Sequence, residues 1–204
     1  MSRGSRAANR IARRGIAWIA GHNPRLLFAQ TISLFYQPFQ PAPEIHPTAT
    51  IDPSCEIGSD IYIGANVVIQ SGVKIGRGVC IYPNVVIYPD VEIGDNTLLH
   101  ANCTIHERTR IGENCVIHSG AVIGAEGFGF VATPAGWFKM QQSGRTVLED
   151  YVEVGCNSNV DRPAAGETRC FSGVGRSLPS GPNRRTSPLW SSVASRASAP
   201  KARA

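Results

Sequence analysis

Histidine side chains are the first candidates for chemistry in this chain, because an imidazole can serve as a general base or as a metal ligand. Five histidines occur, and His100 and His118 are 18 residues apart, with His106 between them. A structural zinc site needs four ligands. No further potential ligand recurs at a fixed spacing from these histidines. We therefore expect no metal and no other cofactor, and keep a metal-binding enzyme as an alternative interpretation.

Two other reactive patterns give weaker signals. The only His-Asn pair, His22-Asn23, precedes all regular patterning, and we interpret it as coincidental. The six cysteines include no CxxC pair, which argues against a redox or zinc motif. We expect reduced thiols in a reducing compartment, and hence a cytoplasmic protein.

The histidines lie within a repeat of six residues that runs from 45 to 128. One column of the repeat is isoleucine or leucine, and a second column, four residues later, is small or β-branched. The first column comprises Ile45, Ile51, Ile57, Ile63, Ile69, Ile75, Ile81, Ile87, Ile93, Leu99, Ile105, Ile111, Ile117 and Ile123. A regular repeat has to be explained before its single residues are interpreted.

A period of six excludes an α-helix, because residues six apart are rotated by about 240° at roughly 100° per residue. An extended chain places positions i, i+4 and i+6 on one side, but a single strand over 45–128 would be roughly 280 Å long. The chain must therefore turn within each hexad. Residues such as Pro47 and Ser59 mark corners at the third position, and Gly58 and Gly76 at the second position permit close stacking of turns.

Three such faces close a coil of 18 residues, so the fourteen hexads predict an all-β fold, a parallel β-helix of about four and two-thirds coils. The isoleucines stack inside it, where burial of each contributes roughly 1.5–3 kcal/mol. After Ile123 the register is lost, and it returns at Leu148. We predict a β-helix over 45–169 with an inserted hairpin loop over 124–147. Loops on a rigid scaffold commonly carry binding residues.

Charge is distributed unevenly along the chain. Residues 1–25 hold six Arg and no acid, and residues 170–204 hold five Arg, one Lys and no acid, so the ends carry +12 and the middle carries −7. Nucleic-acid binding would depend on the ends alone, and we expect no nucleic-acid partner. We predict that residues 1–22 and 170–204 are basic, disordered segments.

Residues 23–44 predict one helix followed by a proline-rich linker. Asn23 is a suitable N-cap, and Pro24 suits the first helical turn. No apolar run in the chain approaches the roughly 18 residues that a membrane span requires, so we expect no membrane span.

Five features together resemble the UDP-3-O-acylglucosamine N-acyltransferases: NPRLLFA, APEIHPTATIDPS, the hexads, GAEGFGF and GRTVLEDYVEVGCNSNVDRP. The hexads alone indicate only the broad hexapeptide-repeat acyltransferase superfamily, whereas the Gly-Phe loop and VDRP are more specific. The resemblance covers roughly residues 23–169. It implies a left-handed β-helix, a homotrimer, and an origin of residues 23–44 as the remnant of a uridine-binding domain.

The resemblance also implies an activity in lipid A biosynthesis. Members of this family transfer a 3-hydroxyacyl chain from acyl carrier protein to UDP-3-O-acylglucosamine, which gives the chain an acyl carrier protein and a UDP-sugar as partners. The residues that the resemblance assigns to substrate binding are Gly127, Phe128, Gly129, Phe130, Asn157 and Asp161.

The family's general base is a histidine on a coil after the Asp-Arg segment, usually followed by asparagine. The last histidine here is His118, so we assign no catalytic residue and expect the chain to be inactive or nearly so. Hexads and acidic residues both end near Arg169, which we interpret as a truncation or a reading-frame shift. The alternatives are a metal-binding β-helix enzyme resembling carbonic anhydrase and a non-catalytic β-helical scaffold.

Overall fold

The computed structural model describes residues 21–171, so the predicted disorder of the basic termini concerns residues that lie almost wholly outside the described part. The chain divides into two compact units, residues 1–40 and residues 41–204. Each unit is described by itself.

The first unit contains the helix α2 (Pro24–Phe35), as predicted. The Asn23 side chain accepts a hydrogen bond from the Leu26 N–H at 3.1 Å, and Pro24 occupies the first turn, where no N–H is needed. The helix ends at Tyr36, which is extended. No residue of α2 is buried. Among the described residues, no helix is long and apolar enough to cross a membrane.

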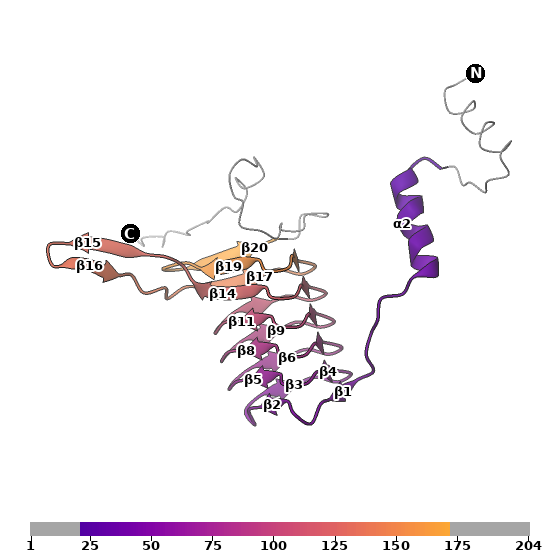
Figure 1. The fold of residues 1–204 in the computed structure, drawn as a ribbon, viewed down its shortest axis with the longest axis horizontal. Coiled ribbons are helices and arrows are strands. Elements are labelled where there is room, and N and C mark those ends of the chain that lie inside the picture. The colour runs from indigo at the N-terminus through magenta and orange to yellow at the C-terminus, as the bar shows by residue number, and fades with distance from the viewer. Residues whose placement is uncertain (1–20, 172–204) are drawn as a thin grey trace, which may run out of the picture. The chain divides into compact units, whose positions relative to one another are not determined.

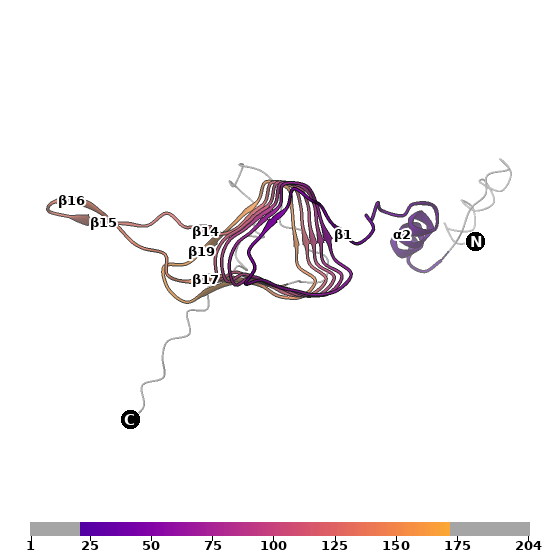
Figure 2. The same cartoon turned by 90° about the horizontal axis from the view of Figure 1, so that it is seen from below.

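The second unit is the predicted parallel β-helix, with coils that are triangular in cross-section (Figures 1 and 2). Each side of the triangle is a six-stranded sheet. Sheet A contains β1 (Glu44–Ile45), β4 (Tyr62–Ile63), β7 (Cys80–Ile81), β10 (Leu98–Leu99), β13 (Val116–Ile117) and β18 (Glu153–Val154). Sheet B contains β2 (Thr50–Ile51), β5 (Val68–Ile69), β8 (Val86–Ile87), β11 (Thr104–Ile105), β14 (Val122–Glu126) and β19 (Asn159–Arg162). Sheet C contains β3 (Glu56–Ile57), β6 (Lys74–Ile75), β9 (Glu92–Ile93), β12 (Arg110–Ile111), β17 (Arg145–Leu148) and β20 (Glu167–Cys170).

The coils stack in a fixed register of 18 residues. Ile63 pairs with Ile81 and Ile87 pairs with Ile105, so every hexad isoleucine lies over another one coil away. One backbone bond recurs in each hexad, as in the Tyr62 N–H, which donates to the Val79 carbonyl at 3.1 Å. Successive coils thereby satisfy each other's backbone polar groups, which a strand of two residues could not do alone.

Both predicted columns point inward. Ile63, Ile81 and Ile105 are fully buried, and the second column from Val67 to Ala121 is buried with them. Three members of the second column are cysteines, and burial raises the pKa of the Cys103 thiol to about 11. A thiol with that pKa is almost wholly protonated at neutral pH, so it serves as a small apolar side chain and not as a nucleophile.

The corners confirm one predicted feature and add another. A Cβ atom on Gly58 would lie 2.8 Å from the Gly76 backbone in the next coil, so glycine at this corner is required by close backbone approach. The sequence interpretation placed turn chemistry at the third hexad position, but the left-handed backbone occurs one residue later. Asn66, for example, has φ 58° there. Asparagine, aspartate and glycine recur at this fourth position because they tolerate positive φ.

The predicted insertion is a hairpin that projects from one corner of the triangle (Figure 2). Its strands β15 (Phe130–Thr133) and β16 (Gly136–Lys139) pair antiparallel. The β-helix register resumes as predicted, because Leu148 pairs with Ile111 and Val154 pairs with Ile117. The insertion therefore leaves the stacking of the coils unchanged.

An inward charge should unfold the β-helix. Ile105→Asp buries a carboxylate without a partner, and we expect the free energy of unfolding to fall by several kcal/mol, of the order found for an unpaired buried polar group. The matched control is Thr104→Asp, at the adjacent position that faces outward in β11. Circular dichroism and urea titration of both variants measure the difference. Equal stability of the two variants would show that the inward column has been misassigned.

Candidate functional site

The Gly-Phe loop lies where β14 leaves the β-helix for the hairpin. Phe128 is 94% exposed, and its ring lies 5.0 Å from that of Phe130, tilted by 53°. The Gly129 carbonyl accepts a hydrogen bond from the Met140 N–H at 2.9 Å, which joins the two arms of the loop. The loop thus presents two aromatic rings to solvent on a backbone that is tied at its base.

The flanking glycines of this loop are close to the β-helix. A Cβ atom on Gly127 would lie 3.4 Å from the Arg162 carbonyl oxygen, and one on Gly129 would lie 3.0 Å from Nε2 of Gln142. Gln142 is itself buried and donates to the Met140 carbonyl at 3.2 Å. The absence of side chains at these glycines lets the loop approach β19 closely.

A buried arginine anchors the loop. Arg162 is 7% exposed, and its guanidinium bonds Glu107 from the preceding coil and Glu126 at the end of β14, the latter at 3.3 Å. Glu126 also accepts from Nζ of Lys139 in β16 at 2.5 Å. One ion-pair network therefore connects two coils and the hairpin. The sequence interpretation did not single out any of these four residues.

The network changes the ionisation of both acids. Burial raises the pKa of the Glu107 carboxyl, but hydrogen bonds from its own backbone N–H and from Arg162 outweigh burial and leave the pKa below its ordinary value. The hydrogen bond from Lys139, its charge, and then Arg162 lower the pKa of Glu126. Both side chains are therefore held as carboxylates, and neither is suited to act as a general base near neutral pH.

The two other predicted substrate residues lie on the last described coil. Asn157 occupies a corner with φ 53°, and its backbone N–H donates to the Ser119 carbonyl at 3.0 Å. A corner role alone accounts for asparagine there. Asp161 belongs to β19, and its Cβ is 3.9 Å from a Cβ built on Gly127. The structure therefore brings Asp161 close to the loop, and substrate binding by both residues remains a prediction.

The histidines form the stacked column that their spacing predicts. The His100 ring is parallel to the His118 ring at 5.1 Å and to the Tyr82 ring at 5.3 Å. His118 ends the series with Nε2 2.6 Å from Oε1 of Glu153. Burial and the neighbouring His118 lower the pKa of His100. Within residues 21–171, no group of three or more His, Cys, Asp or Glu side chains is placed to hold a metal ion.

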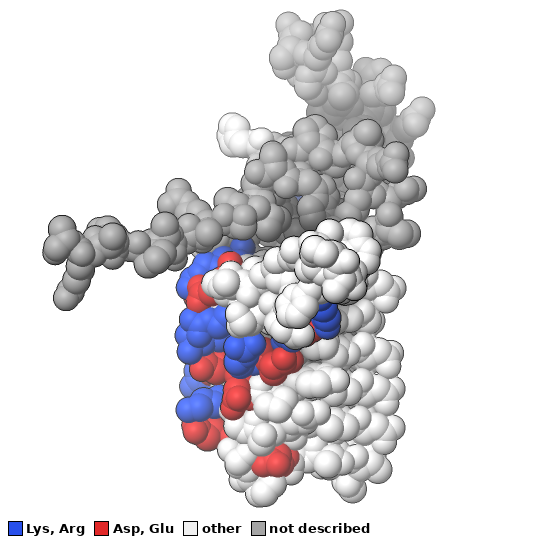
Figure 3. Space-filling view, turned by 90° about the vertical axis from the view of Figure 1, so that its left-hand side faces the viewer, with Lys and Arg blue, Asp and Glu red and all other residues white. Residues whose placement is uncertain are grey.

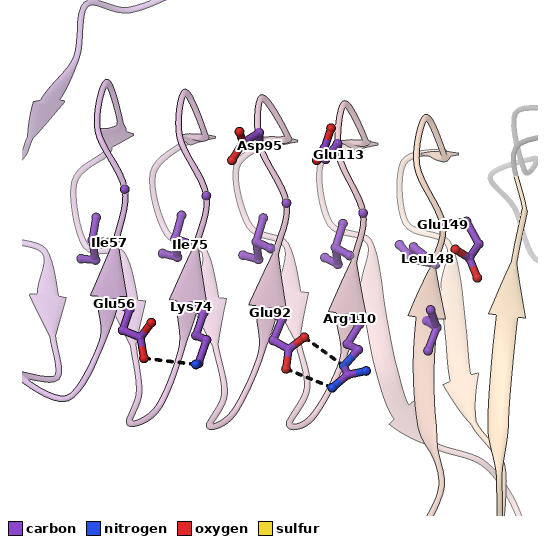
Figure 4. Close-up of a pocket in the computed structure, with 17 residues that line it drawn as sticks. Glu56, Ile57, Lys74, Ile75, Glu92, Asp95, Arg110, Glu113, Leu148 and Glu149 are labelled. Atoms are coloured by element: carbon purple, nitrogen blue, oxygen red, sulfur yellow. Dashed lines mark hydrogen bonds and ion pairs between the residues drawn. The ribbon is translucent and has the colours of Figure 1, made fainter.

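A shallow groove of about 680 Å³ runs along the corner beside sheet C. Its floor is the column of glycines that includes Gly76 and Gly94, and its walls carry ion pairs such as Lys74 with Glu56 at 3.1 Å (Figure 4). Acidic and basic side chains gather side by side in one band of the surface (Figure 3). The charges of this groove neutralise each other, so it offers no net charge to a ligand.

The basic side chains of residues 44–171 are all engaged. Each of the eight contacts a carboxylate or a backbone carbonyl; these residues are Lys74, Arg77, Arg108, Arg110, Lys139, Arg145, Arg162 and Arg169. The described coils therefore lack an uncompensated basic patch.

Comparison with known proteins identifies the class first. The bacterial transferase hexapeptide (six repeats) model matches residues 42–77, 72–107 and 90–125, which agrees with the stacked coils. The β-helix with its inserted loop is thus that of a hexapeptide-repeat protein.

The more specific similarity includes the loop. The chain is 73% identical over 155 residues to the UDP-3-O-acylglucosamine N-acyltransferase of Gloeothece citriformis, which covers 76% of this chain and 44% of that protein. It is 74% identical over 156 residues to the protein of the same name from Microcystis aeruginosa, which covers 76% and 46%. The matched part of the chain belongs to the UDP-3-O-acylglucosamine N-acyltransferase family, and the chain spans less than half the length of these relatives.

Removal of the buried guanidinium should release the loop. We expect Arg162→Met to lower the free energy of unfolding by about 1–3 kcal/mol, because Glu107 and Glu126 lose a partly buried partner. Amide hydrogen exchange over 126–142 should accelerate. The control Arg110→Met breaks an exposed pair with Glu92 and should cost less than about 1 kcal/mol. Unchanged exchange in the first variant would contradict the anchoring role.

The same network predicts a pH dependence of stability. The pKa of Glu126 is lowered in the folded chain, so its contribution is complete above the ordinary value of 4.5 and is lost as pH falls through the lower folded pKa. We expect Glu126→Gln to be less stable than the parent chain near pH 6 and equal to it near pH 3. Urea midpoints of both proteins measure this gap. A gap that stays constant over the pH range would refute the contribution of the carboxylate.

Proposed function

We propose that this chain carries the β-helix and substrate loop of an N-acyltransferase of lipid A biosynthesis. The reaction moves a 3-hydroxyacyl chain from acyl carrier protein to the 2-amino group of UDP-3-O-acylglucosamine. The similarity to Gloeothece citriformis and Microcystis aeruginosa enzymes, at 73–74% identity, carries the proposal. A homotrimer in the cytoplasm completes it.

The exposed aromatic pair supports a binding role for the loop. Phe128 and Phe130 offer apolar surface to an acyl chain, while the tie between Arg162 and Glu126 fixes the base of the loop. Because the loop is anchored before the substrate arrives, less conformational entropy is lost on binding.

The chemistry needs a base that removes a proton from the attacking amine. Glu107 and Glu126 are held as carboxylates of lowered pKa, and no histidine follows His118 in the sequence. We therefore propose that the 204 residues lack the base and transfer acyl groups slowly or not at all.

Docking of the donor is proposed to use residues beyond the described coils. Acyl carrier protein is acidic, and an acidic partner is attracted by unpaired basic side chains. The eight basic residues of 44–171 are engaged with acceptors of the chain itself, as Arg110 is with Glu92. The face that carries sheet C is therefore not the docking surface.

Binding by the loop can be tested without turnover. We expect a soluble 3-hydroxyacyl pantetheine to bind the chain, and expect a double change of Phe128→Ala and Phe130→Ala to weaken the affinity at least about fivefold through lost apolar contact. Tyr151→Ala, which removes an exposed aromatic ring at a corner, is the control. Isothermal titration calorimetry measures all three proteins. Equal affinity of the loop variant and the parent would overturn the assignment of Phe128 and Phe130.

Activity is tested by acyl transfer from acyl carrier protein to UDP-3-O-acylglucosamine. We expect a rate at least about a hundredfold below that of the Microcystis aeruginosa relative assayed in parallel, as the loss of a general base predicts. A comparable rate would show that the base lies within this chain. Translation of the coding DNA in the two other frames after codon 169 is the companion check, and a His-Asn pair within new hexads is the expected result.

A further inference from the structure

Helix α2 exposes an unusual number of large apolar side chains. Phe35 is 86% exposed and Leu34 is 80% exposed, and no residue of the helix is buried. The exposed set continues beyond the helix and comprises Leu26, Phe28, Ile32, Leu34, Phe35, Tyr36 and Phe39. A contiguous apolar surface of this kind marks an interaction site.

The sequence around α2 has a charge of one sign. Residues 1–43 contain six arginines, Arg25 among them, and no aspartate or glutamate, so the first acidic residue of the chain is Glu44. A partner that covers the apolar side chains must therefore accept positive charge beside them. An anionic lipid surface meets both requirements, since its acyl region takes apolar and aromatic side chains and its headgroups attract arginine.

The length of α2 fixes how it could lie in a bilayer. Its 12 residues span about 18 Å at 1.5 Å per residue, which is shorter than the roughly 30 Å hydrocarbon core. We propose that α2, with the arginine-rich residues before it, is an interfacial helix that binds anionic membrane surfaces. This inference is independent of the proposed acyl transfer.

A second copy of the chain is a less suitable occupant of the same surface. Two copies of residues 1–43 would bring together two segments with six arginines each and no acid to pair with them. Like charges at short range oppose association, and salt is needed to screen them. Attraction to an anionic surface changes with salt in the opposite direction, which separates the two occupants experimentally.

The test is co-sedimentation of the full chain with phosphatidylglycerol-phosphatidylcholine vesicles. We expect binding at low salt that falls at least about tenfold when the salt concentration rises from 50 mM to 500 mM, because the headgroup charge is then screened. Vesicles of phosphatidylcholine alone should bind at least about tenfold less. Binding that ignores both salt and lipid charge would overturn the proposal.

Two variants assign the binding to α2. A double change of Leu34→Ser and Phe35→Ser should reduce vesicle binding more than about tenfold, because two exposed apolar side chains leave the interface. Phe138→Ser, at a 68% exposed position on the hairpin, is the matched control and should bind like the parent. Unchanged binding by the double variant would assign the effect to another segment, such as basic residues 170–204, and overturn the proposal. Self-association of the parent without lipid, lost in the double variant, would overturn it in favour of a second copy.

Discussion

The hydrogen bond between a backbone N–H and the carbonyl 17 residues later is the constraint on which the whole β-helix depends. It recurs from coil to coil, as between Glu44 and Ile61 and between Lys74 and Val91. Because each strand has only two residues in most hexads, no strand is stable without its neighbours above and below. The side chains must therefore stack in columns, and each column must suit its place: apolar inside, glycine or asparagine at corners.

The anchoring of the loop follows from the same regularity. The coils hold β14 and β19 side by side, and Glu107 lies on the coil below, so three segments far apart in sequence converge on Arg162. The hairpin adds Lys139 to this point through Glu126. The ion pairs are partly buried, where charge attraction is screened less than at the surface. The candidate site is thus a local addition to a rigid repeat and not a separate domain.

Much of this architecture could be predicted from the sequence, because a six-residue period acts through local rules. The isoleucine column, the hairpin and the return of register at Leu148 required only spacing and turn chemistry. The role of Arg162 could not be predicted, because its partners Glu107 and Glu126 are 55 and 36 residues away and follow no period. Asn157 illustrates a different limit: its residue type fits both a substrate contact and a corner of positive φ.

The spacing across the insertion has a consequence for how such chains vary. Ile111 and Leu148 are 37 residues apart yet occupy adjacent strands, so 19 residues leave the β-helix and return to the point where they left it. The closure entropy of such an excursion grows only slowly with its length. The corner therefore acts as a mounting point, at which segments of different length and composition can be exchanged during evolution, or grafted by design, while the scaffold keeps its pitch.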